Sequence, residues 1–198
     1  MTTSPHHGSD PLSSISWPVR TDRLLLRRAG EADLDLIWAY RGRDDVTRWI
    51  SAAPATLSDH RAAFVEGDFA HRLVIVERDG IVVGDAMIKV EDAWAQAEVR
   101  EAARGTQAEL GWCFDPDHGG RGYATETVRA LVDLCFGPLG LRRVYALCFA
   151  DNEPSWRLME RVGMRREQHL VKESLHRSGA WLDGLGYALL AEEWPPHR

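Results

Sequence analysis

A glycine-rich stretch constrains this chain more than any other feature: residues 118–126 read HGGRGYATE. It follows a strand-like run, Gln107 to Phe114, and opens a segment with helical spacing of apolar residues, Gly122 to Phe136. A strand, a glycine turn and a helix N-terminus together point several backbone N–H groups at one place, with the helix dipole behind them. Such a turn can hold a phosphate or pyrophosphate without a lysine, although a plain connection before a helix has the same local pattern.

Two common phosphate-binding motifs do not fit this stretch. A Walker loop ends in Gly-Lys-Ser/Thr, and no lysine is present here. A dinucleotide fingerprint requires Gly-x-Gly-x-x-Gly, whereas the run that starts at Gly120 ends on Thr125. The sequence therefore excludes both motifs.

The composition limits the class of protein. With 198 residues, of which 44% are apolar, the chain can bury one sizeable core. Its formal net charge of −6 argues against a nucleic-acid partner and favours a cationic one. No apolar run approaches the roughly 20 residues of a membrane span. We expect no signal peptide and no membrane partner, and a cytoplasmic protein that is a monomer or a homodimer.

The three cysteines, Cys113, Cys135 and Cys148, are widely spaced and form no Cys-x-x-Cys pair. This spacing predicts neither a disulfide framework nor a metal site. We expect small buried side chains. Cys113 is also a candidate for lining a site, because its strand leads into the glycine-rich stretch.

The pattern of apolar residues predicts a single mixed α/β domain over residues 19–198, preceded by a mobile tail over residues 1–18. Asp79-Gly80 joins two β-branched runs, which is a strong hairpin signal. The predicted strands are Arg23 to Arg28, Leu73 to Glu77, Ile81 to Lys89, Gln107 to Phe114, Arg143 to Phe149, Arg165 to His176 and Trp181 to Leu189. The predicted helices are Glu31 to Arg41, Asp44 to Ile50, Ser58 to Gly67 with Ser58 as its cap, Gly122 to Phe136 and Pro154 to Arg161.

Residues 90–106 have a different composition, rich in Ala, Glu and Arg, with Trp94 as the one large side chain. A helical insertion and a long mobile loop are equally compatible with this composition. If the segment flanks a cleft, Trp94 could cover a bound acceptor as part of a lid. Four carboxylates there, Glu91, Asp92, Glu98 and Glu101, would then attract cationic acceptors.

The stretch Gly119 to Ala124 resembles the acetyl-CoA pyrophosphate loop of the GNAT acetyltransferase superfamily, Gln/Arg-x-x-Gly-x-Gly/Ala. Gly122 and Ala124 stand at the small positions, while Gly119 departs from the usual Gln or Arg. Other segments resemble, in the same order, the RimJ/RimL-type branch, the N-terminal acetyltransferases of ribosomal proteins. They are Thr21 to Arg27, Asp151 to Ser155, Leu158 to Met164, Gly179 to Asp183 and Tyr187 to Trp194.

This resemblance implies a GNAT-like mixed, mostly antiparallel seven-stranded sheet flanked by helices, in the order β-α-α-β-β-β-α-β-α-β-β. It also implies acetyl-CoA as co-substrate and no metal. Asn152 would hydrogen-bond the pantetheine arm, and Ser155 would hydrogen-bond or protonate the departing thiolate. Tyr145 and Tyr187 stay open as that acid, because tyrosine fills the role in many relatives. The expected cofactor-binding residues are Cys113, Phe114, Gly119, Gly120, Arg121, Gly122, Tyr123, Ala124, Thr125, Asn152 and Ser155.

Two carboxylates are candidates for chemistry on an amine. Alternation in the strand Gln107 to Phe114 puts Glu109 on one face beside two small residues, which leaves room for a substrate. Glu109 therefore suits a general base, although a solvent-facing or ion-paired glutamate is an equally simple explanation. Asp85 interrupts an apolar run and could hold the acceptor's ammonium, unless an arginine partner or an edge position explains it.

The expected reaction is acetyl transfer from acetyl-CoA to a primary amine, by direct attack in a ternary complex. An α-amine is less basic than the amine of lysine, which favours the N-terminus of a protein or peptide, or a weakly basic small amine, as the acceptor without excluding lysine. An acetyltransferase for an aminoglycoside-like or other small antibiotic amine is one alternative. A non-catalytic acyl-CoA-binding module is the other.

Overall fold

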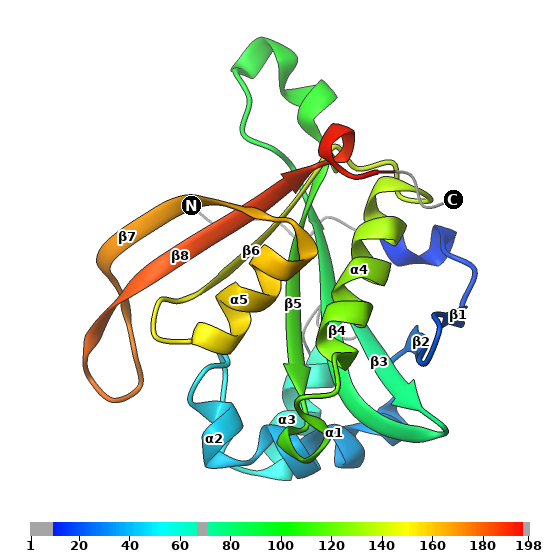
Figure 1. The fold of residues 1–198 in the computed structure, drawn as a ribbon, viewed down its shortest axis with the longest axis vertical. Helices are drawn as coiled ribbons and strands as arrows, with labels where there is room; N and C mark the ends of the chain where they lie inside the picture. The colour runs from blue at the N-terminus through cyan, green and yellow to red at the C-terminus, as the bar shows by residue number, and fades with distance from the viewer. Residues whose placement is uncertain (1–9, 67–70, 196–198) are drawn as a thin grey trace.

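An eight-stranded sheet forms the centre of the molecule (Figure 1). The computed structural model describes residues 10–66 and 71–195. The strands lie in the order β1-β2-β3-β4-β5-β6-β8-β7, and every neighbouring pair is antiparallel except β5 and β6. Their bounds are β1 Val19–Arg20, β2 Leu25–Arg28, β3 Leu73–Arg78, β4 Ile81–Glu91, β5 Gln107–Phe114, β6 Arg143–Phe149, β7 Arg165–Leu175 and β8 Trp181–Leu190.

The expected mixed and mostly antiparallel architecture is confirmed, with one strand more than the predicted seven. The extra strand, β1, is only two residues long, and Val19 pairs with Leu26 of β2. The Asp79-Gly80 hairpin is also confirmed, with φ of 51° at Asp79 and 80° at Gly80. Both angles are positive, as the tight turn between β3 and β4 requires.

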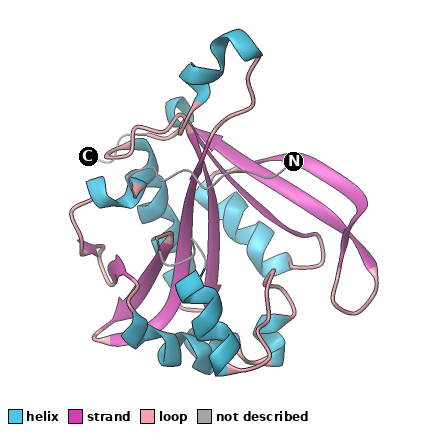
Figure 2. Cartoon of the chain, turned by 180° about the vertical axis from the view of Figure 1, so that it is seen from behind, coloured by secondary structure: helices cyan, strands magenta, loops and turns pink. Residues whose placement is uncertain are grey.

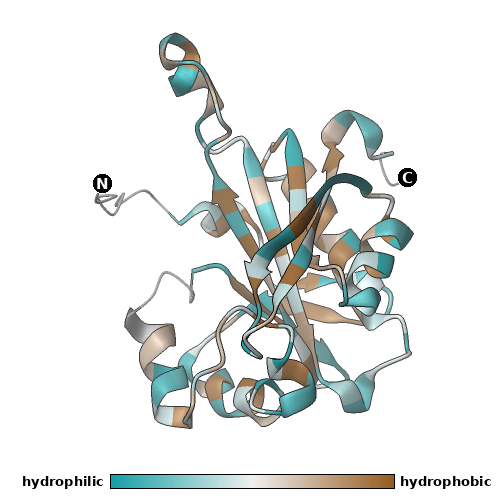
Figure 3. Cartoon of the chain, turned by 90° about the vertical axis from the view of Figure 1, so that its left-hand side faces the viewer, coloured by the Kyte–Doolittle hydropathy of each residue, from teal (hydrophilic) through white to brown (hydrophobic). Residues whose placement is uncertain are grey.

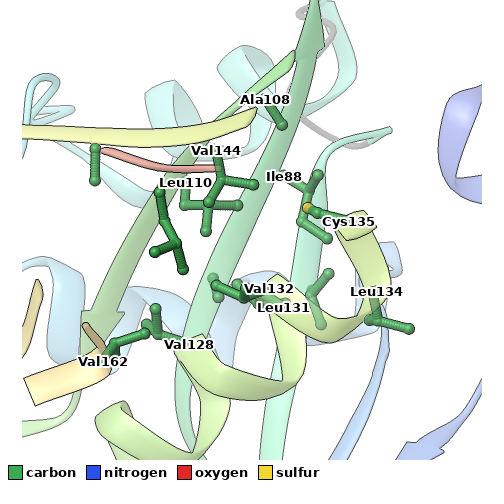
Figure 4. Packing of buried hydrophobic residues seen from close by; sticks show 14 of the residues in the cluster. Ile88, Ala108, Leu110, Val128, Leu131, Val132, Leu134, Cys135, Val144 and Val162 are labelled. Carbon is green, nitrogen blue, oxygen red and sulfur yellow. The ribbon is translucent and has the colours of Figure 1, made fainter. Parts of the chain in front are cut away.

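Helices cover both faces of the sheet. Helices α4 (Tyr123–Phe136) and α5 (Glu153–Val162) pack on one face and contribute to the larger hydrophobic core, part of which Figure 4 shows. Helices α1 (Leu34–Arg41) and α3 (Leu57–Glu66) pack on the other face against a second core (Figure 2). The short α2 (Asp44–Thr47) follows α1. No helix in the described part of the chain is long and apolar enough to cross a membrane.

One predicted cap is wrong. The helix α3 starts at Leu57, and Thr56 caps it in place of Ser58. The Thr56 hydroxyl accepts the Asp59 N–H at 3.1 Å, and the Asp59 carboxylate accepts the Thr56 N–H at 3.1 Å. Asp59 supplies the acidic partner that a capping box needs three residues after the cap, which favours Thr56 over Ser58.

The prediction of a mobile tail is wrong for residues 10–18, whereas residues 1–9 lie outside the described chain. A short 3-10 helix, Pro11–Ser14, places Leu12 in the larger core with 1% of its surface exposed. Asp10 accepts a hydrogen bond from Arg28 of β2 at 2.8 Å. Because this segment has a low apolar content, the sequence did not predict that Leu12 and Ile15 belong to the core, where tertiary packing buries them.

The strands β5 and β6 separate after three residue pairs. Their parallel pairing runs from Gln107 with Arg143 to Glu109 with Tyr145 and goes no further in the described chain. Beyond that point β5 stays paired with β4 as far as Phe114, and β6 with β8 as far as Phe149. The sheet therefore opens between the C-terminal halves of β5 and β6, and backbone N–H and C=O groups there face the gap without a strand partner.

Candidate functional site

The opening between β5 and β6 is part of one cavity of about 1140 Å³. It extends from the glycine-rich stretch, past the two separated strands, to the residues that follow α2. Glu109, Asp85 and all eleven residues expected to contact the cofactor line this cavity. The tertiary structure thus brings together residues that lie up to 70 positions apart, from Asp85 to Ser155.

The glycine-rich stretch forms a tight turn that leads into α4. Gly120 and Gly122 have φ of 72° and 79°, in the left-handed region that favours glycine. Gly122 is the N-cap of α4 and offers no capping side chain, so the first-turn N–H groups face the cavity without an intrahelical partner. Gly119 differs, because its N–H donates to the Pro116 carbonyl at 2.9 Å. The turn from Gly120 onwards is therefore the part that can donate to an anion.

Glu109 lies in a row of charged side chains on the face of the sheet opposite α4. Its register partners are Lys89 on β4 and Tyr145 on β6, and its carboxylate lies 3.4 Å from the Lys89 ammonium. Lys89 also pairs with Glu91, which accepts a hydrogen bond from Tyr145. Hydrogen bonding to Glu91 raises the pKa of Lys89 above its ordinary value. Glu109 shares its cation with Glu91 and keeps 27% of its side chain exposed to the cavity, which a proton acceptor needs.

Asp85 has the arginine partner that the sequence left open. Its carboxylate is buried and accepts hydrogen bonds from Arg41 Nε at 2.8 Å and from the Tyr40 hydroxyl at 2.5 Å. Burial, followed by the nearby charge of Asp85, raises the pKa of Tyr40. The same two causes raise the pKa of Cys113 to about 12, so this thiol stays protonated. Because Asp85 is already neutralised by a buried ion pair, it is not available to hold an acceptor ammonium.

Asn152 and Ser155 stand at the N-terminus of α5, beside the opening. The Asn152 side chain makes no capping hydrogen bond, and only its backbone carbonyl serves the helix, by accepting the Ser155 N–H at 3.1 Å. Burial raises the pKa of the Cys148 thiol to about 11, and the Ser155 hydroxyl acts in the opposite direction. Cys148 also lines the cavity, a position that the sequence pattern of β6 did not single out.

Neither tyrosine considered as an acid lines the cavity within the described residues. The Tyr145 hydroxyl donates to Glu91, and the Tyr187 hydroxyl donates to Glu160 of α5 at 3.0 Å. Burial and a neighbouring carboxylate raise the pKa of both tyrosines. Ser155 therefore is the hydroxyl among these three candidates that reaches the cavity.

A further carboxylate, Glu173, enters the cavity through an irregularity in β7. The register with β8 shifts between Leu170 and Ser174, and Lys172 adopts a φ of 48°. Asp183 holds this bulge by accepting the Lys172 N–H at 2.9 Å. A Cβ on Gly184 would lie 3.6 Å from the Glu173 carboxylate, an ordinary contact distance, so this carboxylate lies beside Gly184 of β8. From its place in a predicted closing strand, Glu173 is a candidate for the wall of the site. Strict alternation could not decide its face, because a bulge resets which face each side chain takes.

Trp94 lies outside the site, which corrects the predicted lid. Residues 92–106 carry a 3-10 helix, Ala97–Ala103, and project from the paired end of β4 and β5 (Figures 1 and 3). Trp94 is 90% exposed, and the cavity lining in the described chain skips from Met87 to Glu109. The segment therefore matches neither predicted form. It is less regular than a helical insertion, because it carries only a short 3-10 helix on an extended stalk, and more regular than a long loop.

We expect a variant in which a short Gly/Ser turn replaces residues 93–103 to keep its acceptor KM within about twofold, because ordinary surface changes away from a site have small effects. Steady-state kinetics at low and moderate salt would measure this. A clear rise in acceptor KM, with unchanged affinity for the acetyl donor, would restore a role for Trp94 in covering the acceptor.

No group of three His, Cys, Asp or Glu side chains in residues 10–66 and 71–195 could hold a metal ion.

Comparisons with known proteins agree with this geometry. The acetyltransferase (GNAT) domain family matches residues 23–165. An uncharacterized N-acetyltransferase of Bacillus subtilis, YnaD, is 32% identical over 180 residues, covering 89% of this chain and 98% of YnaD.

Solved structures show the same fold. A GNAT-family acetyltransferase from Bacillus anthracis superposes with a TM-score of 0.74 at 30% identity, over 89% of this chain and 99% of that one. Mycobacterium smegmatis RimJ, solved in complex with CoA-disulfide, superposes with a TM-score of 0.70 at 24% identity, over 87% of this chain and 84% of RimJ. With the family match and YnaD, these findings show that the chain belongs to the GNAT acetyltransferase family and is an acetyl-CoA-dependent N-acetyltransferase.

Proposed function

We propose that this protein acetylates a primary amine by direct attack on acetyl-CoA in a ternary complex, with a RimJ/RimL-type preference for the α-amine of a protein or peptide. One observation carries the proposal. A single cavity joins a glycine turn at a helix N-terminus to two carboxylates, Glu109, which shares the Lys89 ammonium with Glu91, and Glu173. Both reactants can therefore occupy one space, which supplies the proximity that a ternary-complex reaction needs.

The cofactor would lie along the opening between β5 and β6. The N–H groups from Gly120 to Thr125 would hold the pyrophosphate, since they face the cavity at the positive end of the α4 dipole. The pantetheine arm, which carries amide groups, would pair with the free backbone edge of β5 and with the unused Asn152 side chain. This path would bring the thioester to the neighbourhood of Ser155, which lines the same cavity.

Glu109 would serve as the general base. It would take a proton from the acceptor ammonium, directly or through a water, and the neutral nitrogen would then attack the thioester carbonyl. As the tetrahedral intermediate collapses, the C–S bond breaks and the CoA thiolate leaves. Ser155 would hydrogen-bond or protonate that thiolate. Glu173 is the second candidate base, because in the described chain only the Ser174 hydroxyl donates to it, at 2.5 Å.

Two features bear on the acceptor. The first is basicity: near pH 7.5 an α-amine with a pKa of about 7.8 is roughly one-third neutral, whereas a lysine with a pKa of about 10.4 is only about 0.1% neutral. The second is access. The turn after β7 reaches across to the residues after α2, where Arg177 donates to the Ile50 carbonyl at 2.6 Å. This bridge favours a slender acceptor over a lysine on a folded surface, and it suits a small-molecule amine as well as an extended peptide end.

Acetyl-CoA should raise the melting temperature of the protein, by the equivalent of about 2.7 kcal/mol at a hundred times its Kd. Dephospho-CoA should act similarly, because it keeps the pyrophosphate, and pantetheine should have little effect. Differential scanning fluorimetry measures these shifts. The absence of any shift with millimolar acetyl-CoA, in a sample shown to be folded, would refute the proposed cofactor site.

The acceptor class is tested by following free thiol release from acetyl-CoA across peptides, polyamines and aminoglycosides. We expect peptides with a free α-amine to give the largest kcat/KM, and the same peptides blocked at the N-terminus to give no turnover even when they contain lysine. Preferential turnover of a polyamine or an aminoglycoside would support the small-molecule alternative. Binding of acetyl-CoA without turnover of any amine would support the non-catalytic one.

A further inference from the structure

The segment Thr21 to Arg23 contacts the first turn of α4, about a hundred residues away in the sequence. Both oxygens of the Glu126 carboxylate are occupied by this segment. One accepts the Thr21 hydroxyl at 2.5 Å and the Arg23 backbone N–H at 2.9 Å, and the other accepts Arg23 Nε at 2.7 Å. Glu126 is thereby held by three donors from a single short segment.

Arg23 makes a second contact, with the glycine turn itself. Its Nη1 donates to the backbone carbonyl of Arg121 at 2.9 Å. Its guanidinium lies 5.1 Å from the centre of the Tyr123 ring, and a Cβ on Gly122 would come within 3.4 Å of its Nη2. Arg23 therefore spans the turn from Arg121 to Glu126, yet it is not among the residues that line the cavity.

The position of Glu126 explains why such a contact would matter. A carboxylate in the first turn of a helix is attracted to the same N–H groups and the same dipole as a bound anion. Burial raises the pKa of Glu126, but hydrogen bonds from Thr21 and Arg23 outweigh it, so the pKa is lowered and the carboxylate stays charged. The hydrogen bonds and the ion pair with Thr21 and Arg23 neutralise this charge and occupy both carboxylate oxygens. The same guanidinium donates to the Arg121 carbonyl and so fixes a second point of the turn.

We propose that Arg23 is a positioning residue for the cofactor: it holds the 121–126 turn in the conformation that presents its N–H groups to the pyrophosphate. The inference rests on the cofactor site proposed above. It assigns a role to the Thr21 to Arg23 segment, which otherwise only leads into β2. Arg23 acts through the backbone of the turn and does not touch the cofactor.

The test compares Arg23→Ala with Arg165→Ala as a matched control. The two arginine side chains are 44% and 45% exposed, and each pairs with glutamate, but Arg165 lies on β7 and its partners are Glu167 and Glu193. We expect Arg23→Ala to raise the Kd of acetyl-CoA about tenfold, in the range of couplings between contacting residues. Its kcat and the acceptor KM should stay within about twofold of the wild type. Arg165→Ala should change none of these, although both variants should lose similar, small amounts of stability in urea.

Two further measurements separate positioning from a general loss of structure. S-acetylpantetheine lacks the pyrophosphate, so its weak turnover, given as kcat/KM, should be the same in Arg23→Ala and in the wild type. Arg23→Lys should recover part of the affinity, because one ammonium keeps the charge beside Glu126 but cannot also span to the Arg121 carbonyl. Calorimetry gives the affinities, and thiol release gives the rates.

The inference is overturned if Arg23→Ala binds acetyl-CoA as tightly as Arg165→Ala, or if it loses acetyl-CoA and S-acetylpantetheine turnover by the same factor. Either result leaves the proposed cofactor site standing, provided that the wild type binds acetyl-CoA and that Gly122→Val does not. Wild-type affinity in Gly122→Val would instead show that the proposed site is itself wrong.

Discussion

Gly122→Val should weaken acetyl-CoA binding at least a hundredfold while the protein remains folded. The residue has a φ of 79°, which costs an L-residue roughly 1–2 kcal/mol, and more when the side chain is β-branched. The added Cβ would also meet the Arg23 guanidinium at 3.4 Å. Relief of this strain would rotate the peptide groups of the turn and turn their N–H groups away from the pyrophosphate. Calorimetry with acetyl-CoA and dephospho-CoA measures the loss.

Gly140→Val is the matched control for this experiment. Gly140 also has a positive φ, 62°, and it does not line the cavity. Apart from its two chain neighbours, no described residue has an atom within 4 Å of where a Cβ on Gly140 would lie. Both variants should lose a similar amount of stability because both strain the backbone, but only Gly122→Val should lose affinity. If the two variants bind acetyl-CoA equally well, the glycine turn does not hold the pyrophosphate.

Glu109→Gln should lower kcat/KM about a hundredfold or more at pH 6.5, within the range found for a missing general base. The substitution keeps the shape of the side chain and removes the proton acceptor. Only acceptor that is already neutral would then react, and this fraction rises about tenfold per pH unit below the pKa of the amine. The deficit should therefore shrink as the pH approaches 9. Initial rates of thiol release from pH 6.5 to 9 give the profile for the variant and the wild type.

Glu173→Gln distinguishes the two candidate bases. If Glu109 is the base, Glu173→Gln should change the acceptor KM more than kcat, and its pH profile should follow that of the wild type. A wild-type profile in Glu109→Gln, with a steeper one in Glu173→Gln, would move the role to Glu173. Asp85→Asn is not a useful third comparison, because it leaves Arg41 beside a neutral partner in a buried site and is expected to destabilise the fold.

Local sequence patterns predicted much of the fold. Asp79-Gly80 predicted a hairpin because few residue pairs accept two successive positive φ angles, and β3 and β4 meet there. The bounds of β5, Gln107 to Phe114, were predicted correctly, and so were its faces: Leu110 packs in the larger core with α4, and Cys113 in the second core with α1. These features depend on residues a few positions apart, so sequence periodicity reports them directly.

Contacts between residues far apart in the sequence could not be predicted from such local patterns. Whether Asp85 was an exposed charge or half of a buried pair depended on Arg41, which lies on α1, 44 residues away. Residues 10–18 look like a tail by composition, yet Leu12 is buried because the sheet and α4 leave an apolar surface for it. Trp94 looked like a lid because of its size, but the register of β4 with β5 places it at the far end of the sheet.

By itself, the sequence determined a glycine turn at the start of a helix, a strand that carries Glu109 on its open face, and a family resemblance that links the two. Only the tertiary structure decided that β5 and β6 separate after Glu109 and that a bulge turns Glu173 into the same cavity. It alone decided that Arg23 reaches the Arg121 carbonyl. The reason is physical: φ preferences and side-chain periodicity act over a few residues, whereas strand divergence, bulges and ion pairs depend on how distant segments share space in the folded chain.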